Sequence, residues 1–116
     1  MITSAGGKRW VVPKGIVEDG MSPQESARKE ALEEAGITGR VVPEPVGEYT
    51  YVKWNGTCRV TVYLMHVEEV RDSWPEQPLR SREWVLPEEG ARRVREGALS
   101  GMLREVEATA VRLGAR

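Results

Sequence analysis

Hydrophobic and polar positions recur with different periods along the chain, and these periods predict strands first, then a helix. The apolar segment 9–12 ends at Pro13 and is followed by a turn-rich loop, which is typical of a short strand. Apolar positions at a helical spacing then run through residues 23–35. This helical stripe consists of small side chains only: Ala27, Ala31 and Ala35. A stripe of alanines would let the helix lie close against a sheet.

Both ends of this predicted helix carry strong sequence signals. Ser22 is a preferred N-cap, Pro23 suits the first helical position, and Glu25 completes a capping box three residues after the cap. Gly36 is suited to the C-terminal cap, where a left-handed backbone is common. We therefore expect the helix to run from Pro23 to Ala35.

Further strands are predicted after the helix. Residues 41–52 are rich in valine and tyrosine but contain two prolines and a glycine, which favours two short strands or one bulged strand. Asn55 and Gly56 form a strong hairpin-turn signal. Residues 58–70 are apolar on both faces and predict one central, buried strand, and residues 82–85 predict another strand.

Helical periodicity returns near the C-terminus. A short helix is expected after Pro87, and a longer amphipathic helix is expected to pack on the core through Leu99, Met102, Leu103, Val106 and Ala110. This order of elements predicts a mixed β-sheet flanked by helices, which is an α/β fold in the loose sense (α+β). Residues 1–116 are expected to form a single domain.

Composition narrows the class of protein. The 17 Lys and Arg balance 18 Asp and Glu to a net charge of −1, which argues against a dedicated binder of nucleic acid or membrane. A single cysteine, Cys58, cannot form an internal disulfide, and neither a secretory signal nor a membrane span is apparent. We therefore expect a cytoplasmic protein.

Candidate chemistry lies on the first helix. Glu30, Glu33 and Glu34 are three and four residues apart, so their carboxylates are expected on one side. Clustered carboxylates repel one another unless a cation neutralises them, and hard oxygen ligands suit magnesium. A solvated acidic face is the alternative for these residues alone.

The wider segment 15–37 resembles the Nudix box, G-x5-E-x7-R-E-U-x-E-E-x-G-U, in which U is a bulky aliphatic residue. Matching positions are Gly15, Glu30, Glu33, Glu34, Gly36 and Ile37. Three positions depart from it: Met21 replaces the first glutamate, Lys29 the arginine, and Ala31 a larger aliphatic residue. The resemblance implies a Nudix hydrolase that uses water to cleave a phosphoanhydride bond.

By this resemblance, Glu30, Glu33, Glu34 and the backbone carbonyl of Gly15 would bind Mg²⁺, with Mn²⁺ as a substitute. Glu34 is the first choice for the catalytic base and Glu33 the second. Some family members recruit a base from a later loop, so Glu76 and Glu83 stay open as alternatives.

Similarity beyond the box is greatest to hydrolases of diadenosine polyphosphates and diphosphoinositol polyphosphates. Lys8, Arg9 and Lys14 would receive the phosphates of such a small-molecule substrate. The Pro13-Lys14-Gly15 sequence favours dinucleoside polyphosphates, whose adenine could stack on aromatic residues. The candidates for stacking are Tyr49, Tyr51 and Trp54.

Two differences from the family pattern, one in the box and one at the N-terminus, leave further alternatives open. Met21 and Lys29 would also suit a catalytically silent Nudix domain that binds a nucleotide or a protein partner. The usual first strand of the family is largely absent, because residues 1–4 correspond only to its end. A short gene start would explain this, as would a neighbouring subunit that completes the sheet edge in a homodimer.

Overall fold

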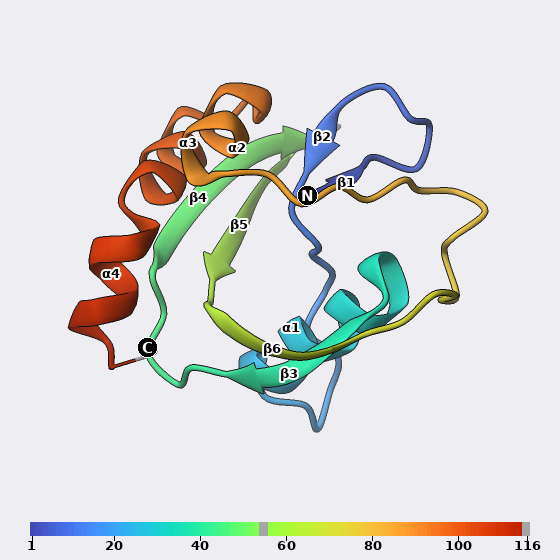
Figure 1. Ribbon diagram of the computed structural model, residues 1–116, viewed down its shortest axis with the longest axis horizontal. Coiled ribbons are helices and arrows are strands. Elements are labelled where there is room, and N and C mark those ends of the chain that lie inside the picture. The colour runs from blue at the N-terminus through green and yellow to red at the C-terminus, as the bar shows by residue number, and fades with distance from the viewer. Residues whose placement is uncertain (54–55, 115–116) are drawn as a thin grey trace.

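A computed structural model describes residues 1–53 and 56–114 (Figure 1). The described residues form six strands: β1 (Ile2–Thr3), β2 (Trp10–Val11), β3 (Ile37–Val41), β4 (Gly47–Lys53), β5 (Gly56–Val62) and β6 (Met65–Val70). The helical segments are α1 (Pro23–Glu30), η1 (Ala31–Ala35), α2 (Pro87–Arg93), α3 (Gly97–Arg104) and α4 (Val106–Arg112). These strands and helices confirm the α+β fold class. The predicted turn at Asn55 and the proposed stacking residue Trp54 lie outside the described residues.

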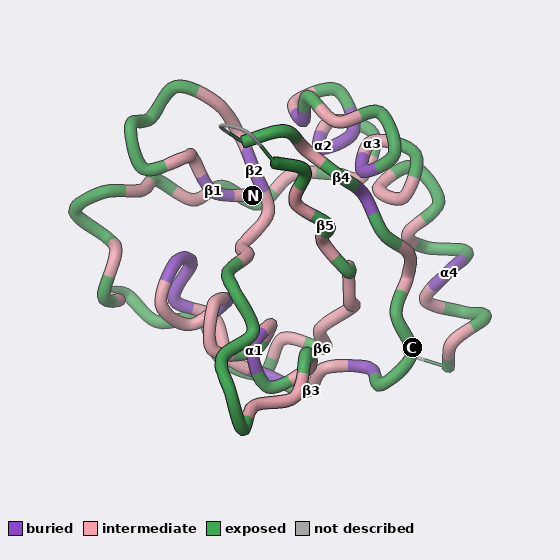
Figure 2. Tube along the Cα trace, turned by 180° about the vertical axis from the view of Figure 1, so that it is seen from behind, coloured by how far each residue is buried: buried purple, intermediate pink, exposed green. Residues whose placement is uncertain are grey.

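The described strands form three antiparallel pairs, β1 with β2, β3 with β6, and β4 with β5, and not one continuous sheet. α3 packs on β4 at one side of the molecule, while α1 packs on β3 at the other (Figure 1). Buried positions are confined to short, separated stretches of these elements (Figure 2). The core is therefore divided between the two sides.

The helix that carries the glutamates follows the sequence prediction. Ser22 Oγ accepts a hydrogen bond from the Glu25 amide at 3.1 Å, and Glu25 Oε1 accepts one from the Ser22 amide at 3.2 Å, which completes the capping box. Gly36 ends the helix with a φ of 70°, a left-handed conformation that favours glycine. The last turn, η1, is a π-helix, a wider turn that is frequent at functional sites.

The prediction of one central strand over residues 58–70 is wrong. The chain bends between Val62 and Met65, so β5 pairs with β4 whereas β6 pairs with β3. Both strands alternate between partly buried and exposed residues and are not buried on both faces. No proline or glycine marks this bend, because the long-range pairing partners determine where each strand ends.

Two other strand predictions are modified. Within residues 82–85, only Arg82 forms a β-bridge, with Ile2. Residues 41–52 contain one strand, β4, which begins at Gly47 and pairs without a bulge, and only the last residue of β3, Val41. Neither two short strands nor one bulged strand is therefore found within this range, and the two prolines lie in the connection between β3 and β4.

The C-terminal helices pack on the core as expected, in three segments. The backbone of Glu105 (φ −95°, ψ 6°) separates α3 from α4, which splits the predicted long helix. Leu99 is only 1% exposed and packs with Tyr49 and Val94. None of the helices in the described part of the chain has the length and apolarity that crossing a bilayer requires.

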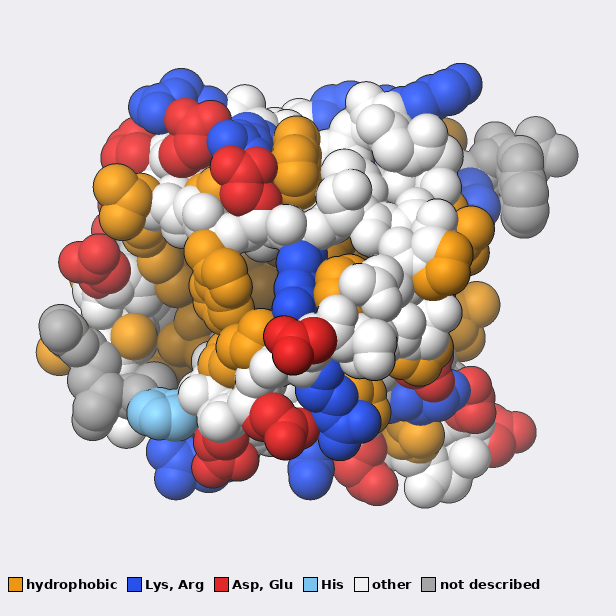
Figure 3. All heavy atoms as spheres, turned by 45° about the vertical axis from the view of Figure 1, so that its right-hand side comes forward, with side chains coloured by type: hydrophobic (Ala, Val, Ile, Leu, Met, Phe, Trp, Pro, Cys, Tyr) orange, Lys and Arg blue, Asp and Glu red, His pale blue; other side chains and the backbone are white. Residues whose placement is uncertain are grey.

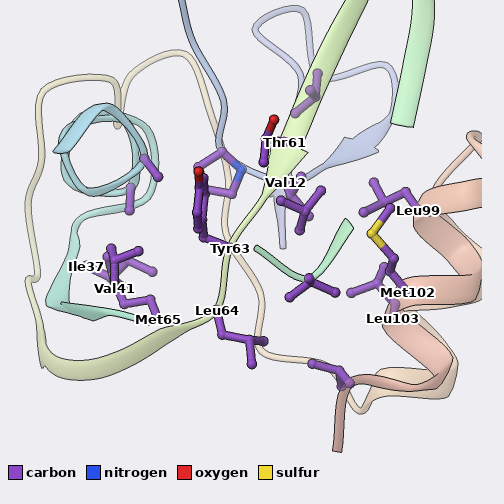
Figure 4. A pocket seen from close by; sticks show the side chains of 17 residues that line it. Val12, Ile37, Val41, Thr61, Tyr63, Leu64, Met65, Leu99, Met102 and Leu103 are labelled. Carbon is purple, nitrogen blue, oxygen red and sulfur yellow. The ribbon is translucent and has the colours of Figure 1, made fainter. Parts of the chain in front are cut away.

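An apolar cavity of about 230 Å³ lies between the two sides of the core (Figure 4). Its walls include Val12, Ile37, Val60 and Leu103. Hydrophobic side chains also gather around a hollow on one face of the molecule (Figure 3).

Candidate functional site

Glu34 is the central side chain of the candidate site. It is only 5% exposed, and its Oε1 accepts a hydrogen bond from the Lys14 amide at 3.2 Å. Burial and, after it, a hydrogen bond with the Glu30 carboxyl raise the pKa of Glu34 to about 7, although the Lys14 amide and the Arg80 charge oppose the shift. A buried carboxyl group that titrates near neutrality is characteristic of functional sites.

Glu30 and Gly15 lie directly beside Glu34. A Cβ atom built on Gly15 would collide with the carboxylate of Glu30, so only glycine permits this close approach of the loop to the helix. Glu30 in turn shares a hydrogen bond with Glu34. The structure therefore brings together Gly15, Glu30 and Glu34, three of the residues expected at the metal site.

Glu33 is placed apart from this pair. Its carboxylate lies 3.7 Å from the ammonium group of Lys29, and its backbone carbonyl accepts a hydrogen bond from the Glu76 amide at 2.9 Å. Across the ranges 1–53 and 56–114, no group of three or more His, Cys, Asp or Glu side chains is arranged to hold a metal ion. Glu30 and Glu34 thus form a pair of carboxylates. The Glu33 side chain would have to turn away from Lys29 to join them as a third metal ligand.

Lys29 braces the helix through a partner that the sequence pattern did not indicate. Its ammonium group lies 2.8 Å from a carboxylate oxygen of Glu18, which is in the loop before the helix. The Nudix box has an arginine at the position of Lys29 and a glutamate at the position of Met21. Here Glu18 supplies the negative charge from three positions earlier, so an ion pair still connects loop and helix.

Arg80 is a second site residue that sequence reasoning missed. One guanidinium nitrogen lies 3.8 Å from Glu34 Oε2, Nε donates to Glu76 Oε1 at 2.7 Å, and another nitrogen donates to the carbonyl of Thr3 at 3.1 Å. The side chain is only 15% exposed. Because 46 residues separate Arg80 from Glu34, no local spacing signal could have revealed the contact.

The two alternative bases differ in position. Glu76 contacts Arg80 and therefore belongs to the surroundings of Glu34. Glu83 instead accepts hydrogen bonds from Arg93, which lowers the pKa of its carboxyl group. Of these two, only Glu76 is connected to the candidate site.

The three residues predicted to bind phosphate differ in their burial and in their partners. Lys14 is partly buried, lies 5.2 Å from the centre of the Tyr51 ring, and has its pKa lowered chiefly by burial. Arg9 forms an ion pair with Glu96 at 3.0 Å, so its charge is already balanced within the protein. Lys8 is exposed in the loop between β1 and β2. Lys14 is thus the cation whose backbone contacts the carboxylate site directly.

These residues fit a divalent metal ion. Glu30 and Glu34 provide two adjacent carboxylates, and the close approach of Gly15 brings loop backbone next to them. Magnesium is usually held by one or two carboxylates together with waters and substrate phosphates, so a complete protein cage is not required. A bound cation would also favour the ionised form of Glu34, which burial disfavours.

The fold and the site together define a small α+β domain with a carboxylate pair on a helix that follows a glycine-containing loop. The chain matches the model of the NUDIX domain over residues 2–107. It is 33% identical to Nudix hydrolase 16, mitochondrial, of Arabidopsis thaliana over 97 residues, which cover 77% of this chain and 53% of that protein. The chain therefore belongs to the NUDIX domain family.

Two other relatives extend this comparison. Nudix hydrolase 18, mitochondrial, of Arabidopsis thaliana is 37% identical over 91 residues, covering 77% of this chain and 51% of the relative. Diphosphoinositol polyphosphate phosphohydrolase 3-beta of Bos taurus is 31% identical over 83 residues, covering 70% and 49% respectively. The chain spans about half the length of these curated relatives.

Proposed function

We propose that this protein hydrolyses a phosphoanhydride bond of a small polyphosphorylated substrate, with a divalent metal ion at Glu30 and Glu34. The observation that carries the proposal is the buried Glu34 carboxyl, which lies beside Glu30, Gly15 and Arg80. A carboxyl group that is costly to ionise in isolation is retained at the helix position that the Nudix box assigns to catalysis.

Glu30, Glu34 and the Gly15 carbonyl would hold Mg²⁺, with Glu33 as a further ligand once it leaves Lys29. The bound ion would neutralise phosphate charge and lower the pKa of a water molecule. Arg80 lies against Glu34 and keeps that carboxylate oriented toward the site. The Lys14 amide fixes its other oxygen, so the carboxyl group is held from two sides.

Glu34 is the first candidate for the proton acceptor in this scheme. The Lys14 amide and the Arg80 guanidinium hold its carboxyl group beside Glu30 and Gly15, where the attacking water would be activated. Glu33 is the second candidate, since its exposed carboxylate could turn toward the same water. The water attacks phosphorus as its proton passes to this base, the bridging P–O bond of the phosphoanhydride breaks, and the bridging oxygen leaves with its bonding electrons on the second phosphate product.

The substrate class rests on the relatives and on local charge. One relative is named as a diphosphoinositol polyphosphate phosphohydrolase. Lys14 and Lys8 offer cations beside the loop, while Arg9 would first have to leave Glu96. We propose a diadenosine polyphosphate or a diphosphoinositol polyphosphate as substrate.

A catalytically silent NUDIX domain is the second candidate. It was suggested by Met21 and Lys29, which depart from the box. The ion pair between Lys29 and Glu18 supports activity, because loop and helix remain braced.

The deciding experiment measures release of phosphate or nucleotide from diadenosine tetraphosphate and from a diphosphoinositol polyphosphate, with and without Mg²⁺. Magnesium-dependent turnover of either substrate would support the hydrolase. Binding of both substrates without turnover, in folded protein with Mg²⁺ present, would identify the silent domain.

Replacing Lys14 tests phosphate binding. We expect Lys14→Met to raise KM about tenfold with a smaller change in kcat, because the backbone amide that orients Glu34 is kept while the cation is lost. Steady-state kinetics would measure this, with Arg112→Met on the exposed side of α4 as the control for the loss of one positive charge. A change confined to kcat would contradict a role in substrate binding.

Replacing Lys29 tests the bracing ion pair. We expect Lys29→Met to lower turnover about threefold to tenfold, and Lys29→Arg to keep it, because arginine retains the charge that contacts Glu18 and Glu33. Adding Glu18→Gln to Lys29→Met should cause little further loss. Losses that multiply in the double variant would show that the two residues act independently.

A further inference from the structure

The glutamate helix, which consists of α1 and η1, ends in carbonyl groups that lie against a distant arginine. Arg82 Nη1 donates to the carbonyl of Ala35 at 2.8 Å and lies 3.5 Å from the carbonyl of Gly36. Arg82 Nη2 donates to the carbonyl of Arg71, which directly follows β6. The last carbonyls of a helix have no intrahelical partner, and a positive charge beside them is favourable. The Arg82 side chain therefore connects the end of this helix to the end of β6.

The guanidinium group of Arg82 also stacks on Trp74. Its central carbon lies 4.1 Å from the centre of the Trp74 ring, which is within the range of a cation–π contact. A Cβ built on Gly36 would lie 2.7 Å from Arg82 Nη1 and 2.9 Å from the Trp74 ring, so only glycine leaves room for both side chains. We refer to Gly36, Trp74 and Arg82 together as the helix-end clamp.

The helix-end clamp holds residues 75–81, because its tryptophan precedes this segment and its arginine follows it. Two contacts join the segment to the candidate site. The Glu76 amide donates to the Glu33 carbonyl at 2.9 Å, and a guanidinium nitrogen of Arg80 lies 3.8 Å from Glu34 Oε2. The clamped segment therefore meets the helix at the carboxyl group that the proposed reaction uses.

We propose that Arg82 is a positioning residue, which holds residues 75–81 against the end of the glutamate helix and thereby keeps Arg80 beside Glu34. This role rests on the hydrolase activity proposed above. In the part of the chain that the structure describes, Arg82 donates hydrogen bonds only to backbone carbonyls, so its effect on Glu34 must pass through the segment. Lysine could not replace it fully, because an ammonium group lacks the planar fork that reaches two carbonyls while it stacks on Trp74.

The first test follows amide hydrogen exchange of the whole chain and does not depend on turnover. Arg82→Ala should speed exchange of the Glu76 amide about tenfold, because the segment that carries this amide is no longer held against the helix. Exchange of the Ser26 amide, at the other end of the helix, should stay unchanged. Arg40→Ala on the exposed side of β3 is the matched control. Unchanged exchange at Glu76 in Arg82→Ala would overturn the proposal.

Steady-state kinetics then test whether the clamp serves the reaction. Arg82→Ala should lower kcat about tenfold with little change in KM, because the substrate-binding groups stay in place. Adding Arg80→Ala to Arg82→Ala should cause little more loss than Arg80→Ala alone, since Arg82 acts through Arg80. Millimolar guanidinium ion should restore part of kcat to Arg82→Ala, whereas an equal concentration of sodium chloride should not. If Arg82→Ala fails to fold, Arg82→Lys provides the same tests with smaller effects.

The outcomes separate this role from the proposed function. Normal kcat in Arg82→Ala, with an active wild type, would overturn the positioning role and leave the hydrolase intact. Losses that multiply in the double variant would show that Arg82 stabilises the fold without acting through Arg80, which also overturns the role. A wild type without turnover would overturn the proposed function, and exchange at Glu76 would still decide whether Arg82 holds residues 75–81.

Discussion

Glu34→Gln is expected to lower magnesium-dependent turnover by about 100-fold to 10,000-fold, the range typical of losing a general base. Glutamine still accepts the hydrogen bond from the Lys14 amide, so the helix and loop should keep their positions. It can neither take a proton from water nor supply a charged ligand to the metal. Steady-state kinetics on the better of the two substrates would measure the loss.

The same substitution should stabilise the metal-free protein at alkaline pH. Because the folded-state pKa of Glu34 is raised to about 7, the folded protein holds this proton more tightly than the unfolded chain does. The stability from this proton is complete below the unfolded pKa and is lost as pH rises through about 7. Glutamine stays neutral, so its advantage should reach about 3 kcal/mol at pH 8 and vanish near pH 4.

Thermal or urea unfolding at pH 5 and pH 8 in a chelator would test this pH dependence. Glu107→Gln is the matched control, because it makes the same change on the exposed side of α4. It should leave both turnover and stability nearly unchanged. Equal stability of Glu34→Gln and wild type at pH 8 would show that burial of Glu34 costs little.

Local features of the fold could be predicted from sequence because their causes are local. The capping box at Ser22 and Glu25 and the left-handed cap at Gly36 involve residues within one turn of each other. The bend between Val62 and Met65 has no such cause, since β4 and β3 compete for successive parts of the same apolar run. Strand partners that lie far along the chain were therefore needed to place it.

The residues of the candidate site also divide into those that the local sequence predicts and those that distant segments supply. Gly15, Glu30 and Glu34 follow from the box and are brought together. The spacing of Glu33 suggested that it joins them. The last turn is instead a π-helix, and the ammonium group of Lys29 attracts the Glu33 carboxylate. Arg80 and Glu18 reach the site from segments whose positions only the folded chain determines.

The second large effect is expected from Gly15→Ala. The added Cβ would occupy the space of the Glu30 carboxylate, so either that carboxylate must turn away or the loop must withdraw. Both movements disrupt the arrangement that would hold Mg²⁺. Displaced ligand surroundings typically cost 10-fold to 100-fold in metal affinity, and we expect a loss of about that size.

The measurement for Gly15→Ala is the rise in melting temperature with increasing Mg²⁺ concentration, which reports metal binding without requiring turnover. Gly101→Ala is the control, because a Cβ on this glycine of α3 meets open space. If Gly15→Ala retained the Mg²⁺ response of the wild type, the close packing of Gly15 on Glu30 would not be part of the metal site. A loss of turnover with an unchanged response would instead place Gly15 at the substrate, since the metal would then still bind while the loop no longer presents the phosphates correctly.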